Sequence, residues 1–177
     1  NWNPSPANIS FDEKSMEAFK RYSGITDLNW PNDVLANGKY RLHWIDFRTS
    51  QNAMYVKSIA EAVRRGDPNA LTETWSDGFL KPYPTHSIYS VHASDISKFA
   101  KYVDQVTVGT YVYPHDPVLD MLSIEGQIEK VRDTVEAVRP TPVVPCVAGS
   151  HEIGGRAQIQ ANPDLLKYQI ISHLMRS

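Results

Sequence analysis

Carboxylates, aromatic rings and histidines gather at three places in this sequence, each at or after a strand-like segment. Glu73, Trp75 and Asp77 recur at two-residue spacing, which puts their side chains on one face of an extended chain. The other two groups of candidates are Tyr111, Tyr113 and His115, and then His151 and Glu152. Two carboxyl groups can act together, one as an acid and the other as a nucleophile or base, as hydrolysis of a glycosidic bond requires. Aromatic rings beside such carboxylates suit the apolar C–H face of a sugar.

Each carboxylate candidate also has a structural explanation. Glu73 lies inside a short predicted strand, between Thr72 and Thr74, and a sheet covered on both faces would bury it. A buried carboxylate there either pairs with a basic residue of a barrel interior or acts on a substrate. Glu152 lies in a long predicted loop over residues 149–163, so it is either a catalytic nucleophile or a solvated surface group.

The aromatic and histidine candidates likewise have both a functional and a structural explanation. Tyr111 and Tyr113 alternate with a valine and either contact a sugar or pack inside a barrel. His115 follows a proline and lies either at a binding site or in a turn. The histidines lack metal-ligand spacing and the glycines form no phosphate-binding fingerprint, so we expect no metal site and no cofactor. The single cysteine, Cys146, lies in an apolar run and is expected to be a buried core thiol.

The elements that must position these residues alternate between strands and helices. Apolar spacing predicts strands near residues 70–76, 105–112 and 142–148. Helices are predicted from Ser10–Asp12, with Ser10 as the N-cap, to Gly24, and over residues 39–65, 93–102, 124–138 and 163–175. This alternation predicts βαβ units, a parallel sheet and an α/β fold class. Because the carboxyl ends of parallel strands meet at one edge, the three groups of candidates should lie together there.

The longest predicted helix has the clearest apolar pattern. Its large apolar side chains recur at helical spacings, as on the packed face of an amphipathic helix: Trp44, Phe47, Met54, Tyr55, Ile59 and Val63.

Three short runs stand out beside these elements, namely Phe19-Lys20-Arg21-Tyr22-Ser23-Gly24-Ile25, Trp44-Ile45-Asp46-Phe47 and Asp67-Pro68-Asn69-Ala70. By these runs and the order of its elements, the chain resembles glycoside hydrolases that have a (β/α)8, or TIM, barrel, especially the β-galactosidase-like group. It implies that residues 1–177 form a single incomplete barrel segment, a partial TIM barrel that runs from the end of strand four to helix seven. The predicted strands would then be strands five, six and seven.

The resemblance also implies a function for the full-length parent, namely hydrolysis of glycosidic bonds in carbohydrate metabolism. It makes Glu152 the nucleophile by its position after strand seven. It places the general acid/base on strand four, before Asn1, so the isolated chain would lack that group. The alternative is a non-catalytic sugar-binding or scaffold barrel that keeps aromatic strand ends without the acid pair.

The composition of the chain limits the classes of partner that we expect it to bind. A formal net charge of −2 gives no basic surface for nucleic acid or an anionic membrane, and no apolar run approaches the roughly 20 residues of a membrane span. We therefore expect a carbohydrate substrate and neither a nucleic-acid nor a membrane partner, with the oligomeric state left open. No signal peptide is visible and both ends look cut, so the compartment stays open, although a secreted or periplasmic location is compatible with the sequence.

Overall fold

The computed structural model of the chain describes residues 10–76, 93–110, 117–147, 150–153, 157–160 and 167. The chain divides into two compact units, and each is described here by itself. The first unit takes the described residues up to Asn69 together with residues 93–102, and the second takes residues 70–76 and those from Val103 onward.

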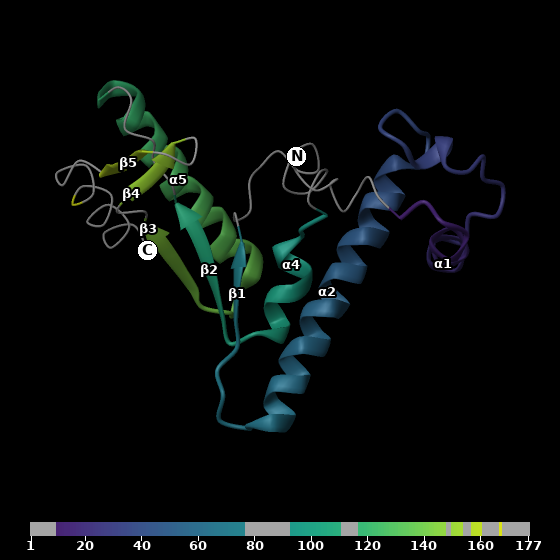
Figure 1. Cartoon of the computed structure of the whole chain (residues 1–177), viewed down its shortest axis with the longest axis horizontal. Coiled ribbons are helices and arrows are strands. Elements are labelled where there is room, and N and C mark those ends of the chain that lie inside the picture. The colour runs from purple at the N-terminus through teal and green to yellow at the C-terminus, as the bar shows by residue number, and fades with distance from the viewer. Residues whose placement is uncertain are drawn as a thin grey trace. The chain divides into compact units, whose positions relative to one another are not determined.

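The first unit is helical (Figure 1). Its elements are α1 (Glu13–Ser23), the short 3-10 helix η2 (Asn32–Val34), α2 (Arg41–Gly66), α4 (Ile96–Phe99) and the 3-10 turn η3 (Ala100–Tyr102). The helices predicted over residues 39–65 and 93–102 are therefore confirmed in position, the second as an α-helical turn that continues into a 3-10 turn.

Helix α1 ends where the sequence predicts but begins differently. Gly24 closes it in the left-handed conformation, with φ 73°, which glycine adopts without a steric penalty. At the other end the N-cap is Asp12, whose carboxylate accepts a hydrogen bond from the Ser15 backbone N–H at 2.9 Å. The prediction of Ser10 as the N-cap is wrong, because Asp12 offers a better-placed acceptor two residues later.

An aromatic core holds α1, η2 and the first half of α2 together. Phe19, Val34 and Trp44 are fully buried, and Phe47 is nearly so. The rings of Phe19 and Trp44 pack edge to face with their centroids 5.5 Å apart, an arrangement that the aromatic quadrupole favours. In this half of α2, the large apolar residues of the predicted pattern, Trp44 and Phe47, are therefore buried.

In the second half of α2, the large apolar residues of the predicted pattern are not buried. Its large apolar side chains are exposed, namely Met54, Tyr55, Ile59 and Val63. The buried positions there are the alanines Ala53 and Ala60. Helix α4 packs against α2, and the Asn52 side chain donates to the Ala93 carbonyl at 3.3 Å. Small side chains allow this close approach, so the prediction that one apolar face runs the length of the helix is wrong.

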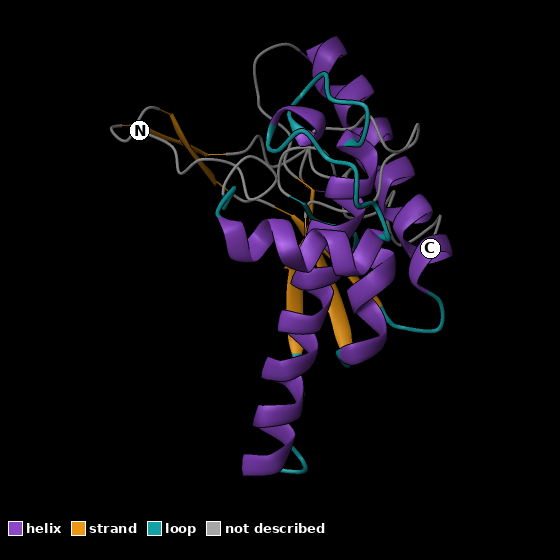
Figure 2. Cartoon of the chain, turned by 90° about the vertical axis from the view of Figure 1, so that its right-hand side faces the viewer, coloured by secondary structure: helices purple, strands orange, loops and turns teal. Residues whose placement is uncertain are grey.

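The second unit contains a parallel sheet (Figure 1 and Figure 2, strands orange in Figure 2). Its three strands are β1 (Glu73–Ser76), β2 (Gln105–Thr110) and β3 (Val143–Val147), in the order β1-β2-β3 with both pairs parallel. This confirms the predicted strands and their parallel pairing, and the mixture of helix with a small parallel sheet agrees with an α/β class. Helix α5 (Pro117–Val138) joins β2 to β3 and begins well before the predicted residue 124.

A short antiparallel hairpin follows the sheet. Strands β4 (Ser150–Ile153) and β5 (Ala157–Gln160) pair where the sequence analysis predicts a loop. Of the predicted last helix over residues 163–175, the structure describes Lys167, which is helical.

The two faces of the sheet differ in character. Helix α5 packs against β2 and β3, and both Val106 and Val108 are fully buried. The α5 side chains Ile128 and Val131 are buried as well. Alternation along each strand therefore leaves the neighbouring residues of β2 on the opposite face.

Candidate functional site

The face of the sheet opposite α5 carries the sequence-predicted residues that the structure describes on β1. The register pairs Glu73 with Gln105 and Trp75 with Thr107, and paired residues of parallel strands share a face. The register of β2 with β3 continues the same face. We call this surface the open face, and it consists of Glu73, Trp75, Gln105, Thr107, Val144 and Cys146.

Glu73 is held by polar neighbours from β2. Its carboxylate accepts a hydrogen bond from the Gln105 amide nitrogen at 2.5 Å and another from the Thr107 hydroxyl at 2.7 Å. The hydrogen bond from Thr107, followed by that from Gln105, lowers the pKa of the Glu73 carboxyl below its ordinary value. Glu73 is therefore an ionised acceptor in a fixed orientation at neutral pH.

The expectation that Glu73 is buried is wrong. The residue is exposed, whereas a parallel sheet covered on both faces would bury it. Its described partners are an amide and a hydroxyl rather than a basic residue. Glu73 is also the first residue of β1, at the amino end of the sheet, whereas barrel active sites lie at the carboxyl ends of strands.

The rest of the open face is partly apolar. Trp75 is 49% exposed and Val144 is 41% exposed, so both present apolar surface to solvent. Cys146 is exposed on β3, which makes the prediction of a buried core thiol wrong. An indole ring two residues from an ionised carboxylate can stack on a sugar ring while the carboxylate accepts its hydroxyl hydrogens.

The hairpin holds two more candidates. His151 and Glu152 lie in β4, where they pair with Ile159 and Gln158 of β5. Glu152 is thus in a strand that follows β3 closely in sequence, and not in a loop. Its role as a nucleophile stays a prediction.

Four candidates lie outside the described residues, namely Asp77, Tyr111, Tyr113 and His115. Asp77 follows the last residue of β1, and Tyr111 follows the last residue of β2. Their proposed contacts with a sugar remain predictions.

Lys130 is a polar residue that the sequence analysis did not single out. It is buried on α5, and its ammonium group donates to the Gly109 carbonyl of β2 at 2.5 Å. A lysine in a helix rich in charged residues gives no sequence signal of burial, since such side chains usually face solvent. The bond joins the helix to the carboxyl half of β2.

A second polar cluster, also missed, lies in the first unit. The Asp46 carboxylate accepts hydrogen bonds from the Tyr22 hydroxyl and the Lys98 ammonium group, each at 2.5 Å. Burial alone would raise the pKa of Asp46, but the bonds from Lys98 and Tyr22 lower it below its ordinary value. Burial and the hydrogen bond to Asp46 raise the pKa of Tyr22. Only tertiary structure brings Lys98 to Asp46, so spacing in the sequence could not reveal the cluster.

Two further findings concern the residues that the structure describes. No helix among them is long and apolar enough to cross a membrane. No group of three His, Cys, Asp or Glu side chains among them could hold a metal ion. No protein-family model, no curated protein and no solved structure matches this chain.

Proposed function

We propose that this chain is part of a (β/α)8-barrel glycoside hydrolase and that the full-length protein hydrolyses glycosidic bonds. The observation that supports this best is the order of the strands. Each parallel strand pairs with the next one in sequence, β1 with β2 and β2 with β3. A barrel is built this way throughout, whereas a doubly wound sheet reverses its order at a switch point.

The character of the two faces supports the same proposal. In a barrel the helices cover the outside, so the face opposite α5 would line the interior. That face is lined by polar side chains and an indole ring, and beyond Glu73 and Gln105 at its amino end it offers the Trp75 ring and the Thr107 hydroxyl, which are groups of the kinds that stack on sugar rings and bind sugar hydroxyls.

Roles for the individual residues follow from this placement. Glu152 would be the nucleophile, because it comes soon after β3, the proposed seventh strand. Glu73 is already ionised, cannot donate a proton at neutral pH and lies at the amino end of β1, so we assign it to positioning Gln105 and Thr107 inside the barrel. The proposed sugar-binding residues are Trp75, Asp77, Tyr111, Tyr113, His115 and His151.

The test is hydrolysis of activated aryl glycosides by the full-length protein and by two variants, Glu152→Gln and Glu73→Gln. Loss of a covalent nucleophile should lower the rate by about three orders of magnitude or more. The Glu73→Gln change keeps the shape of the side chain and removes its charge, and we expect a smaller loss of about ten-fold.

The two variants also distinguish the alternatives. If Glu152→Gln leaves the rate nearly unchanged, the nucleophile is another residue. If the wild-type protein binds oligosaccharides but hydrolyses none of the glycosides, the non-catalytic sugar-binding barrel becomes the better account.

A further inference from the structure

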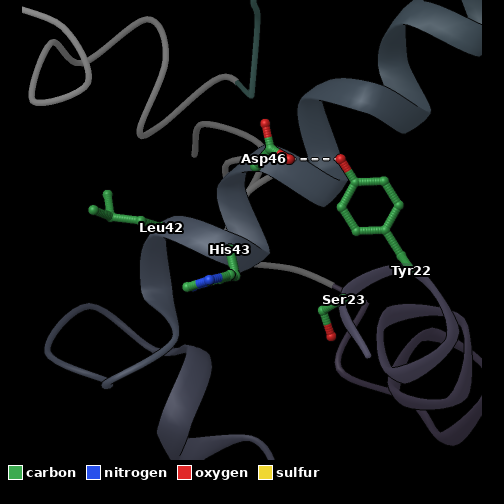
Figure 3. A pocket seen from close by; sticks show the side chains of 5 residues that line it. All are labelled: Tyr22, Ser23, Leu42, His43 and Asp46. Carbon is green, nitrogen blue, oxygen red and sulfur yellow. Dashed lines mark hydrogen bonds between the residues drawn. The ribbon is translucent and has the colours of Figure 1, made fainter. Parts of the chain in front are cut away.

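The first unit contains a hollow of about 230 Å³ between the last turn of α1 and the first turns of α2 (Figure 3). It is lined by Tyr22, Ser23, Leu42, His43 and Asp46. Its volume is below the roughly 300 Å³ at which pockets for drug-sized ligands begin, so it suits a ligand of about one ring.

The Asp46 carboxylate is fixed at one side of this hollow. One oxygen accepts from the Tyr22 hydroxyl and the other from the Lys98 ammonium group. Lys98 is itself held by the Asp46 carbonyl at 3.1 Å, the Thr49 hydroxyl at 2.8 Å and the Ser50 hydroxyl at 3.1 Å. The carboxylate side chain is still 46% exposed. A carboxylate offers about four acceptor positions, so some remain open for a ligand.

The other polar side chains of the lining differ in what they can offer. The Ser23 hydroxyl donates to the Phe19 carbonyl at 2.8 Å and accepts from the Ile25 N–H at 3.2 Å, so it is already engaged. His43 is exposed, and its ring packs edge to face on Tyr40. Both ring nitrogens of an imidazole can take part in hydrogen bonds. Asp46 and His43 are therefore the groups best able to bind a ligand.

The charges of the hollow favour a neutral ligand. Lys98 balances the charge of Asp46 in an ion pair, which weakens attraction for a cation, while the carboxylate repels an anion. The exposed Leu42 side chain and the Tyr22 ring add apolar surface.

We propose that this hollow is a binding site for a vicinal diol on a single neutral ring, such as one sugar unit. One hydroxyl donates to the open acceptor positions of Asp46, and the adjacent hydroxyl bonds to the His43 imidazole. The ring packs against Tyr22. None of the residues that line the hollow takes part in the proposed hydrolysis, so this proposal does not depend on the catalytic one.

The test is titration of the 177-residue chain with a neutral methyl glycoside, followed by NMR of the histidine and tyrosine rings. We expect saturable shifts of the His43 and Tyr22 signals in the millimolar range. His43→Ala and Asp46→Asn should each weaken binding about ten-fold, the effect of losing one hydrogen bond to a buried or charged group. Tyr55→Ala is the matched control, because Tyr55 is exposed on the same helix and does not line the hollow.

Three results would overturn the proposal. The first is an absence of ring shifts at Tyr22 and His43 in the wild-type chain. The second is unchanged binding in His43→Ala, an exposed position whose replacement leaves the core intact. The third is tighter binding of guanidinium ion than of the glycoside at equal ionic strength, which would make the hollow a cation site.

Discussion

Single residues decide how the polar groups of this protein are arranged, and Lys98 is the clearest case. Its ammonium group contacts the side chains of Asp46, Thr49 and Ser50 and the Asp46 carbonyl, all on α2. The long side chain of Lys98 thus links α4 to α2 through hydrogen bonds. Nothing in the local sequence around Lys98 indicates this, because its partners lie some fifty residues away.

Replacement of Lys98 by methionine should destabilise the first unit. The change removes the hydrogen bonds from Lys98 to the Thr49 and Ser50 hydroxyls and to the Asp46 carboxylate, which keeps its bond from Tyr22. Hydrogen bonds to charged groups of this kind contribute about 1–3 kcal/mol to the free energy of unfolding. Urea denaturation measures this. The control is Lys20→Met, which removes a surface pair with Glu17 at 3.2 Å on α1, worth about 0.2–1 kcal/mol. Equal losses in the two variants would contradict the account.

The pKa of the Glu73 carboxyl tests whether its hydrogen bonds from β2 stabilise the ionised form. Its pKa is lowered by the hydrogen bonds from Thr107 and Gln105, so the folded state favours the ionised form. Such a group stabilises the protein above its unfolded-state pKa, and this contribution is lost as the pH falls through the folded-state pKa. We expect Thr107→Val to raise the Glu73 pKa toward its ordinary value, as measured by NMR titration of the side-chain carboxyl. Ser97→Ala, distant in sequence and on α4, is the control and should leave that pKa where it is.

A comparison of the predicted helices and strands with those of the structure shows which features a local sequence pattern can predict. The strands β2 and β3 appear where valines recur in short segments, and β1 appears within the short strand predicted over residues 70–76. The end of α1 at Gly24 is likewise local, since one φ angle determines it. The exposed half of α2 was not predictable, because close packing against α4 depends on distant residues. The β4–β5 hairpin is local, since Ile153 pairs with Ala157, and Gly154-Gly155 between the strands is a turn signal that the loop prediction did not use.

The two halves of α2 allow a matched comparison. Ile45 is 2% exposed and Ile59 is 47% exposed on the same helix. Ile45→Ala should lower the free energy of unfolding by about 2–5 kcal/mol, since it leaves a cavity in the core. Ile59→Ala should change it by less than about 0.5 kcal/mol, as surface substitutions do. Thermal and urea unfolding of the two variants measures both, and a large loss at Ile59 would mean that this face of α2 is packed.

For the molecule as a whole, the sequence predicts the class of fold better than the site. Parallel strands alternating with helices follow from periodicity, and the structure has them. The open face could be predicted only in part. The two-residue spacing of Glu73 and Trp75 indicates a shared face, but their partners Gln105 and Thr107 depend on the register between strands, which no local pattern gives. The polar cluster of Tyr22, Asp46 and Lys98 depends entirely on tertiary contacts.

The central claim is that the full-length protein hydrolyses glycosidic bonds with Glu152 as the nucleophile. The most direct measurement is rescue of the Glu152→Ala variant by azide, with an activated aryl glycoside as substrate. Removing the carboxylate should lower the rate by about three orders of magnitude or more, and azide, which fits the space left by the side chain, should restore part of it and yield a glycosyl azide. A variant that keeps the wild-type rate, or one that azide leaves inactive with no glycosyl azide formed, would contradict the claim.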